Sequence, residues 1–363
     1  MKILHVYKDF YPPVHGGVER YIHDVTAFMS SRGHECTVLV SSGGPSVRER
    51  RRFHGDCEIV ESPCLCRILS NPVCPGLHLA MRRLHEEKSF DLLHFHHPLP
   101  SAVFAWMAAR LDVPHVVTYH SDIVRQAALV PLIEPFLWPF LKKAAAVIAT
   151  SPAYVESSRF LDRLSNVKVV PLGVDTGRFS PGPSSEPPGY FLFVGKFRRY
   201  KGIPTLLEAW KGLPGERLVM VGNGPQDEVV RKASSDSGSM IDPLGEVSDE
   251  RLIELYRGAT ALLLPSTERS EAFGTVQIEA MACGTPVIST RIRTGVPWVN
   301  EDGTSGITVP PGDAEALRKA VSAMSDTDLR NRLAAGALAR AREMFDLEKT
   351  MLSLESVCLD AVR

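Results

Sequence analysis

Short apolar runs that alternate with helical stretches constrain the fold of this chain more than any other feature. The first run is Lys2–Tyr7, and later runs end in turns that lead into stretches of helical periodicity. The pattern begins again at Tyr190–Val194, after residues 182–189, which are rich in proline, glycine and serine. Continuous apolar runs are typical of strands buried in a parallel sheet. The sequence therefore predicts two α/β units with a boundary near residue 185.

The size and charge of the chain narrow the class of protein. At 363 residues, two domains are more natural than a single hydrophobic core. The net charge of −1 gives no global field that would favour nucleic acid as a partner. The opening residues 1–10 lack the apolar region of a signal peptide, and no stretch of the sequence is long enough to span a bilayer. We therefore expect a cytoplasmic protein.

Seven cysteines without regular spacing argue against a disulfide framework and favour free thiols in a reducing compartment. Cys64, Cys66 and Cys74 lie near His78, which makes a zinc site conceivable. The spacing C-x-C is shorter than the spacing usual in zinc sites, so we expect no metal there.

Two stretches could touch a membrane surface. Residues 127–143 carry many large apolar side chains followed by Lys142 and Lys143, but three prolines make the stretch poor as one regular helix. Packing in the core or lining an acceptor groove explains it equally well. Arg48 and residues 50–52 form a basic run on an expected loop, where solvation is favoured over contact with anionic lipid.

A strand, a loop and a helix are expected over residues 259–287. Residues 259–264 form the strand, and Phe273-Gly274-Thr275 open the helix, with Thr275 as the expected N-cap. Gly284 ends the helix as its C′ residue. The first turn of such a helix exposes backbone N–H groups and the positive end of the helix dipole, which together suit a phosphate.

Two carboxylates flank this helix start, Glu271 before it and Glu279 one turn inside it. Carboxylates repel phosphate but accept hydrogen bonds from hydroxyls. The arrangement suits a diphosphate with a hydroxyl-bearing group at each end, as in a nucleotide diphosphate sugar. Glu279 would then hold the ribose and Glu271 the sugar. The alternative is that both glutamates lie on a solvated face.

The residues Glu271–Val287, E-A-F-G-x-x-x-x-E-A-M-A-C-G-x-P-V, resemble the E-x7-E region of retaining GT-B glycosyltransferases, the group 1 enzymes of family 4. Ala272 departs from the pattern, since proline is common there in the family. The resemblance covers nearly the whole chain, and more strongly after residue 186. It implies two Rossmann-like domains that face each other across a central cleft. It also implies transfer of a sugar to a hydroxyl with retention of configuration, without a metal ion or other cofactor.

The resemblance also assigns roles to single residues. Glu271 would hold hydroxyls of the donor sugar and His120 would contact the same sugar. The family is described by front-face attack in which the leaving phosphate takes the acceptor proton, which implies no covalent role for Glu271. Lys196 stands where the family pattern G-R-x-x-x-x-K-G has arginine, so charge is kept but the bidentate fork is lost. The substrate-binding residues implied by the family are Gly16, Gly17, Lys196, Lys201, Val247, Phe273, Gly274, Thr275 and Glu279.

The family pattern also suggests where the domains begin and end. Residues 171–175, P-x-G-V-D, resemble the segment that closes the first domain. The last helix of the family crosses back onto that domain, and Phe345-Asp346 would mark the crossing. We therefore expect an acceptor-binding domain over residues 1–185 with 346–363, and a nucleotide-sugar-binding domain over residues 186–345.

The expected donor is GDP-mannose or a related GDP-deoxyhexose, with UDP-hexoses as the next choice. Residues 120–124 and 293–300 look like those of bacterial mannosyl- and rhamnosyltransferases of O-antigen synthesis. The acceptor would be a glycan or a lipid-linked glycan, with possible peripheral contact with the inner membrane surface. A nucleotide-sugar epimerase on the same fold, a Rossmann oxidoreductase and a non-catalytic sugar-nucleotide binder are the alternatives. The absence of G-x-G-x-x-G after either first strand counts against the oxidoreductase.

Overall fold

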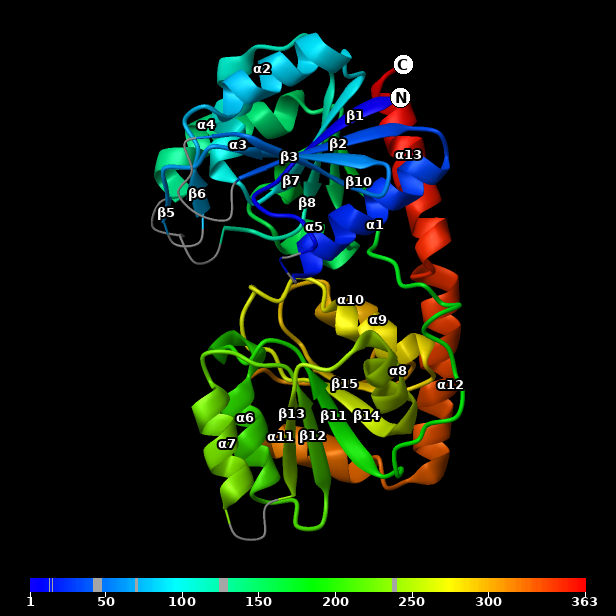
Figure 1. Ribbon diagram of the computed structural model, residues 1–363. Coiled ribbons are helices and arrows are strands. Elements are labelled where there is room, and N and C mark those ends of the chain that lie inside the picture. Colours follow the sequence, from blue (N-terminus) through cyan, green and yellow to red (C-terminus); the bar gives the residue numbers. More distant parts are fainter. Residues whose placement is uncertain (13, 15, 42–47, 69–70, 124–129, 237–239) are drawn as a thin grey trace. The chain divides into compact units, whose positions relative to one another are not determined.

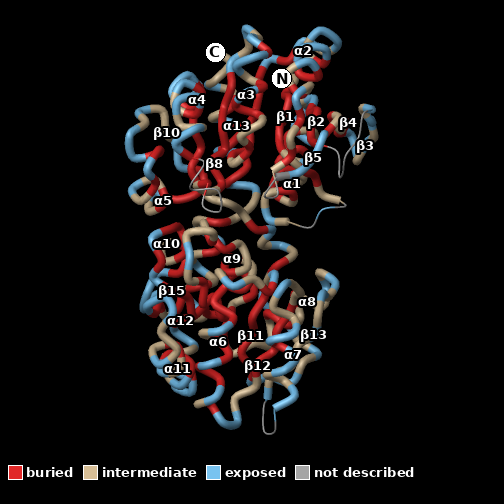
Figure 2. The backbone as a smooth tube through the Cα atoms, turned by 90° about the vertical axis from the view of Figure 1, so that its left-hand side faces the viewer, coloured by how far each residue is buried: buried red, intermediate tan, exposed pale blue. Residues whose placement is uncertain are grey.

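The computed structural model describes the chain except for residues 13, 15, 42–47, 69–70, 124–129 and 237–239. The described residues form two compact units. The first unit contains Met1–Thr150, Val155–Val170 and Met351–Arg363, and the second contains Ser151–Tyr154 and Pro171–Thr350. In both units the buried residues follow the strands (Figure 2).

An eight-stranded sheet forms the centre of the first unit (Figure 1). Its strand order is β10-β9-β8-β7-β1-β2-β4-β3, and only the edge strand β3 runs antiparallel to its neighbour. The order of the strands reverses between β1 and β7, which makes this pair the topological switch point of the sheet. The strands are β1 (Lys2–Val6), β2 (Glu35–Ser41), β3 (Arg50–His54), β4 (Cys57–Ser62), β7 (Leu92–His97), β8 (His115–Tyr119), β9 (Ala146–Ala149) and β10 (Val167–Val169), with a separate hairpin of β5 (Cys66–Ile68) and β6 (Asn71–Val73).

The helices that accompany this sheet follow its strands in the chain. They are α1 (Gly17–Ser31), α2 (Leu77–Lys88), α3 (Pro100–Ala109), α4 (Val130–Lys143) and the last part of α5 (Pro152–Ser157), from Val155 onward, with a 3-10 turn at Leu161–Arg163. The C-terminal helix α13 (Leu347–Ala361) contributes its residues from Met351 onward to the same unit. There the carboxylate of Glu355 pairs with Arg32 at 2.8 Å and with His34 at 2.9 Å.

The second unit has a six-stranded sheet, parallel throughout, in the order β13-β12-β11-β14-β15-β16. The switch point lies between β11 and β14. The strands are β11 (Tyr190–Val194), β12 (Arg217–Val221), β13 (Ile241–Gly245), β14 (Ala259–Leu264), β15 (Val287–Thr290) and β16 (Gly306–Val309). The helices are α6 (Ile203–Trp210), α7 (Asp227–Ser235), α8 (Asp249–Gly258), α9 (Thr275–Ala282), α10 (Val296–Val299), α11 (Ala314–Ala323) and α12 (Thr327–Met344), with a 3-10 turn at Arg199–Lys201.

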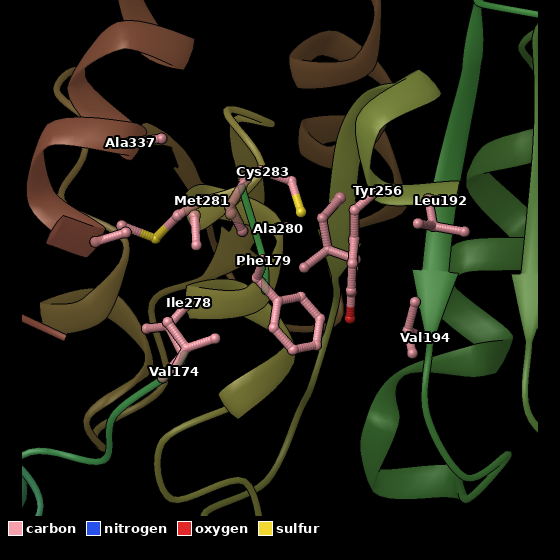
Figure 3. Close-up of a cluster of buried hydrophobic side chains, with 14 of the residues drawn as sticks. Val174, Phe179, Leu192, Val194, Tyr256, Ile278, Ala280, Met281, Cys283 and Ala337 are labelled. Carbon is pink, nitrogen blue, oxygen red and sulfur yellow. The ribbon is translucent and has the colours of Figure 1, made fainter. Parts of the chain in front are cut away.

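Alternation along β11 sorts the core of the second unit into two layers. Leu192 and Val194 pack on one face with side chains of α8, α9 and α12, as Figure 3 shows for Tyr256, Ile278 and Ala337. Phe191 and Phe193 pack on the other face with side chains of α6, α7 and α11. Because both faces are covered, the strands read as continuous apolar runs in the sequence.

Most of the expected strands are confirmed, and two expectations are wrong. Residues 50–54 form strand β3 rather than a loop, because they pair with β4 and their charges meet acidic partners such as Glu61 and Glu87. Residues 130–143 form one helix despite Pro135 and Pro139. Burial of Leu137 and of residues 140–141 in the core outweighs the lost helix hydrogen bonds.

The chain passes into the main part of the second unit at Pro171, whereas the sequence places a boundary near residue 185. Val174 pairs with Asp346 in a parallel bridge, and its N–H donates to Phe345 O at 2.8 Å. Phe179 packs on the ring of Tyr256. These contacts hold the segment before the proline-rich stretch against the second unit.

Candidate functional site

Two loops meet at the switch point of the second sheet. The loop after β11 ends in Gly202, and the loop after β14 begins with Pro265. Tyr200 O accepts a hydrogen bond from Thr267 N at 2.8 Å. Gly202 has φ 77°, and a Cβ there would collide with the carbonyl oxygen of Pro265. Only glycine therefore allows this approach of the two loops.

The two loops bring Lys201 and Glu271 together. Lys201 Nζ lies 2.5 Å from Glu271 Oε2, and Ser266 Oγ donates to the same oxygen at 3.1 Å. Both charged residues are buried, with exposed fractions of 9% and 8%. Burial is the largest single influence on the pKa of Lys201 and lowers it, but the charge and hydrogen bond of Glu271 together with Tyr200 outweigh burial, and the pKa is raised. A buried ion pair at the carboxyl ends of two central strands therefore marks this edge of the sheet.

Helix α9 starts directly after this loop with a left-handed residue. Gly274 is the N-cap with φ 75° and ψ 70°, and no side chain caps the helix among the described residues. Thr275 is the first helical residue, so its expected role as N-cap is wrong. The sequence pattern favours a Thr cap, but the left-handed turn at Gly274 moves the boundary one residue earlier.

The rest of α9 holds its N-terminus in place. Phe273 is buried, and its ring centroid lies 5.8 Å from that of Phe345 and 6.5 Å from that of Trp298. At the other end, Gly284 has φ 82°, its N–H donates to Met281 O at 3.0 Å, and Thr285 N donates to Ala280 O at 2.9 Å. These bonds form a Schellman motif, so the expected C′ glycine is confirmed.

Glu279 lies one turn inside α9 and is half-buried. Tyr256 of α8 donates its hydroxyl to Glu279 Oε2 at 2.7 Å. Burial, followed by the charge of Glu279, raises the pKa of Tyr256 well above its ordinary value, so the hydroxyl stays a donor. Tyr256 thus orients one oxygen of this carboxylate, a contact that the sequence does not reveal.

Lys196 and Val247 lie on the neighbouring loops. Lys196 Nζ, half exposed, contacts Glu246 Oε1 at 3.0 Å and Asn223 Oδ1 at 3.3 Å. Val247 packs partly buried against the core of the unit. Ser248 caps α8 by accepting a hydrogen bond from Arg251 N at 3.3 Å, as the sequence indicates. The loops after β11, β12 and β13 therefore join at the same edge.

The first unit holds the remaining expected site residues. Gly16 is the N-cap of α1 and Gly17 its first residue. A Cβ on Gly16 would collide with the carboxylate of Glu19, whereas Gly17 has open space. Two neighbours in this loop, residues 13 and 15, lie outside the described residues. His120 follows β8 and is buried, and its Nε2 lies 3.2 Å from His96 Nδ1.

The cysteines behave as free thiols, as expected. Cys64 Sγ lies 3.1 Å from Cys66 O, and Cys74 Sγ lies 3.3 Å from Ser41 Oγ. A different group could hold a metal among the described residues. Ring nitrogens of His5, His94 and His96 lie within 4.8 Å of one another, and all three residues are buried. The sequence does not reveal this group, because His5 lies on β1 and the other two histidines on β7, far apart in the chain.

No helix in the described part of the chain is both long and apolar enough to cross a bilayer. Helix α4 leaves Leu132 and Phe136 exposed, at 69% and 37%. Phe104 of α3 is also exposed, and its ring centroid lies 5.1 Å from that of Phe136.

The sequence matches two protein families over adjoining ranges. Residues 15–178 match "Glycosyltransferase Family 4", and residues 178–340 match "Glycosyl transferases group 1". The O-antigen chain mannosyltransferase C of Escherichia coli is 34% identical over 358 residues, covering 95% of this chain and 94% of that protein. The chain belongs to the family 4 (group 1) glycosyltransferases. The D-rhamnosyltransferase WbpZ of Pseudomonas aeruginosa is 32% identical to this glycosyltransferase, covering 95% of this chain and 92% of that protein.

Solved structures of glycosyltransferases share the fold. Sucrose-phosphate synthase from Thermosynechococcus elongatus superposes on this glycosyltransferase with a TM-score of 0.82 at 22% identity, covering 98% of each chain. Anabaena HepE in complex with UDP-glucose gives a TM-score of 0.77 at 20% identity, again covering 98% of each chain. The fold of this glycosyltransferase is GT-B, built from two Rossmann-like units, as the sequence predicts.

Proposed function

We propose that this glycosyltransferase transfers mannose or a related deoxyhexose from a GDP-sugar to a hydroxyl of a glycan or lipid-linked acceptor. Cell-surface polysaccharide synthesis would be its setting. The names of the two relatives above, a mannosyltransferase of the O-antigen chain and a D-rhamnosyltransferase, support this choice of sugar. The single observation that carries the site is the ion pair between Lys201, in the loop after β11, and Glu271, in the loop that leads into α9.

The donor diphosphate would bind at the N-terminus of α9. The residues Phe273–Thr275 supply backbone N–H groups there, and the helix dipole favours negative charge. Lys201 is held next to the loop before α9 by its ion pair with Glu271, and Lys196 lies on the loop that follows β11. Both cations would stabilise the charge that develops on the departing diphosphate, so no metal ion is required.

The two carboxylates would hold the two ends of the donor. Glu279, oriented by Tyr256, would accept hydrogen bonds from the ribose hydroxyls. Glu271 would accept hydrogen bonds from the donor sugar and favour the positive charge that develops at its anomeric carbon. Val247 lies on the loop after β13, and its backbone would meet the nucleobase. In the first unit, Gly16 and Gly17 would face the diphosphate and acceptor, and His120 would contact the donor sugar.

Retention of configuration would follow from front-face attack. The acceptor oxygen forms a bond to the anomeric carbon on the face from which the diphosphate leaves. The bond between that carbon and the phosphate oxygen breaks, and the acceptor proton passes to the leaving phosphate. In this scheme the domain of residues 186–345 binds the donor, and residues 1–185 with 346–363 bind the acceptor.

Exposed apolar side chains on the first unit support peripheral contact with the inner membrane surface. Phe104, Leu132 and Phe136 are exposed, and Lys142 and Lys143 end α4. Aromatic and aliphatic side chains beside lysines suit an anionic interface. Such contact would bring the enzyme to a lipid-linked acceptor from the cytoplasmic side.

Calorimetric titration with GDP, UDP and ADP tests the donor. We expect GDP to bind most tightly, whereas preferential binding of UDP would assign a UDP-hexose donor. Release of nucleotide from the donor without acceptor, with a change in the sugar, would identify an epimerase. Tight donor binding without nucleotide release across an acceptor panel would make the protein a non-catalytic binder.

Variants test the two glutamates separately. Glu271→Gln should lower turnover by about a hundredfold or more while sparing affinity for free nucleotide, because it removes charge at the reacting carbon. Glu279→Ala should weaken nucleotide binding by about tenfold or more through loss of charge-assisted hydrogen bonds. Glu268→Ala, on the same loop but exposed, is the matched control. Parent-like binding and turnover in both site variants would refute the site.

A further inference from the structure

Histidines gather on one face of the first sheet at its switch point. The register places His5 of β1 opposite His94 of β7, and His96 of β7 opposite Thr118 of β8. Side chains two residues apart share a face, so His94 and His96 lie on the same side. His120, two residues after Thr118, follows the end of β8. The histidines therefore form a row across three neighbouring strands.

Three of these histidines form a hydrogen-bonded chain. His5 Nδ1 lies 3.3 Å from His96 Nε2, and His96 Nδ1 lies 3.2 Å from His120 Nε2. The exposed fractions are 0% for His5, 1% for His96 and 7% for His120. Tyr7 and Tyr21 pack their rings against both His96 and His120, with centroids 5.2 to 6.5 Å away. The row of hydrogen-bonded histidines thus runs from His5, which is fully buried, to His120, which keeps 7% of its surface exposed.

Burial of all three rings favours the neutral form of each imidazole. Burial lowers the pKa of His5 and of His120 to about 3, and it lowers the pKa of His96 well below its ordinary value. A neutral imidazole carries one N–H donor and one acceptor nitrogen. The two N–H···N hydrogen bonds must therefore run in the same direction along the three histidines. The position of the proton on the histidine at one end fixes that direction.

The buried end of the chain sets this direction. His5 Nε2 is buried and has no hydrogen-bond partner among the described residues. A buried N–H without an acceptor is rarer in proteins than an under-satisfied acceptor. The proton of His5 is then on Nδ1 and is donated to His96. His96 must carry its own proton on Nδ1 and donate it to Nε2 of His120.

We propose that His5 and His96 are positioning residues that hold His120 as the tautomer with its proton on Nδ1. His120 then presents an Nδ1–H donor, with Nε2 occupied as an acceptor inside the protein. A fixed donor suits an oxygen of a sugar hydroxyl and cannot accept a proton from the acceptor substrate at Nδ1. The inference rests on the proposed contact of His120 with the donor sugar, but the tautomer itself does not.

A metal site at His5, His94 and His96 is the competing explanation. An imidazole ligand directs its lone pair at the metal within the plane of its ring. Both ring nitrogens of His96 already lie within hydrogen-bond distance of another histidine, at 3.3 Å from His5 Nδ1 and 3.2 Å from His120 Nε2. A metal at this site would therefore have to replace one of these hydrogen bonds. The hydrogen-bonded chain is therefore the better explanation.

Nitrogen-15 NMR of the full-length protein measures the tautomer directly. In protein labelled with ¹⁵N-histidine, we expect His120 to show a protonated Nδ1 and an unprotonated Nε2 at pH 7.5. The signals are assigned by comparison with His120→Gln. A protonated Nε2 on His120 would overturn the proposal. So would about one equivalent of transition metal in the purified protein that is lost in His94→Gln.

Two variants of His96 separate the two links of the chain. The amide of asparagine in His96→Asn lies near the position of Nδ1 and can still donate an N–H to His120. The longer side chain in His96→Gln places its amide near the position of Nε2, where it can bond to His5 but not to His120. We expect the Asn variant to keep the wild-type tautomer of His120. The Gln variant should lose it, with a fall of about tenfold in kcat/KM, the effect of one hydrogen bond. Equal tautomers and equal kinetics in the two variants would overturn the proposal.

His94→Gln is the matched control. His94 is as buried as His96 and lies on the same face, but its Nε2 bonds to Thr118 Oγ1 at 2.7 Å, outside the chain. We expect wild-type kinetics and tautomer from this variant. If the proposed contact between His120 and the sugar is wrong, His120→Gln will turn over normally while the tautomer result still holds. The two failures are therefore distinguishable.

Discussion

At the scale of single residues, the Lys201–Glu271 pair shows how closely stability and the proposed chemistry are linked. Both side chains are about nine-tenths buried, and each needs the other to balance its charge. Lys201→Met should lower the free energy of unfolding by about 3 kcal/mol, because it leaves a buried carboxylate without a cation. Lys196→Met, which breaks an exposed pair, should cost less than about 1 kcal/mol. Denaturant unfolding measures both, and equal costs would contradict the buried pair.

The hydrogen bond from Tyr256 to Glu279 tests the proposed role of the second carboxylate of the site in nucleotide binding. Tyr256→Phe removes only the hydroxyl that donates to Glu279 and keeps the ring in the core. Because the carboxylate loses this one hydrogen bond, we expect nucleotide affinity to fall about fivefold. Calorimetry on the free nucleotide measures it. An unchanged dissociation constant would mean that the ribose does not bind at Glu279.

At the scale of elements, α9 begins and ends with left-handed glycines that differ in their surroundings. A Cβ on Gly274 would lie 2.6 Å from Leu264 Cδ2, whereas a Cβ on Gly284 would meet only Pro181 Cγ at 3.6 Å. Gly284→Ala should therefore cost about 1 kcal/mol from backbone strain alone, and Gly274→Ala about 3 kcal/mol. Only Gly274→Ala should also weaken nucleotide binding. A loss of affinity from Gly284→Ala alone would place the diphosphate elsewhere.

The elements also show what the sequence could and could not predict. Strands such as β1, β11 and β14 are predictable because they are buried on both faces and read as apolar runs. Helix α4 and strand β3 are not, because local signals at Pro135 and at residues 50–52 are outweighed by packing and by charges from distant segments. The pairing of Lys201 with Glu271 needs the strand order of the sheet, which a single sequence does not contain.

At the scale of the whole molecule, the histidines are distributed unevenly. All twelve lie within the first 120 residues, so the first unit holds every one and the second unit none. The sequence alone shows that the histidines are concentrated in the first unit. Their alignment across β1, β7 and β8 depends on how these strands pair, which only the fold reveals. Among the residues that the structure describes, six histidines are buried with a pKa below the ordinary value: His5, His94, His96, His97, His115 and His120.

This uneven distribution predicts that acid destabilises the first unit selectively. The folded-state pKa of these histidines is lowered by burial, to about 3 for His5 and about 4 for His97, whereas the unfolded chain binds protons near pH 6.5. Below pH 6.5 the unfolded state therefore binds more protons than the folded state. Stability is fully present above that pH and is lost as the pH falls toward 4, by about 1.4 kcal/mol per pH unit for each histidine.

Tryptophan fluorescence can follow the two units separately. Trp106 and Trp138 lie in the first unit, and Trp210 and Trp298 lie in the second. In variants that keep only one pair, the melting temperature reported from the first unit should fall steeply between pH 7.5 and 5.5. The second unit should change much less, because it contains no histidine to protonate. Parallel shifts in both units would mean that the buried histidines do not control acid sensitivity.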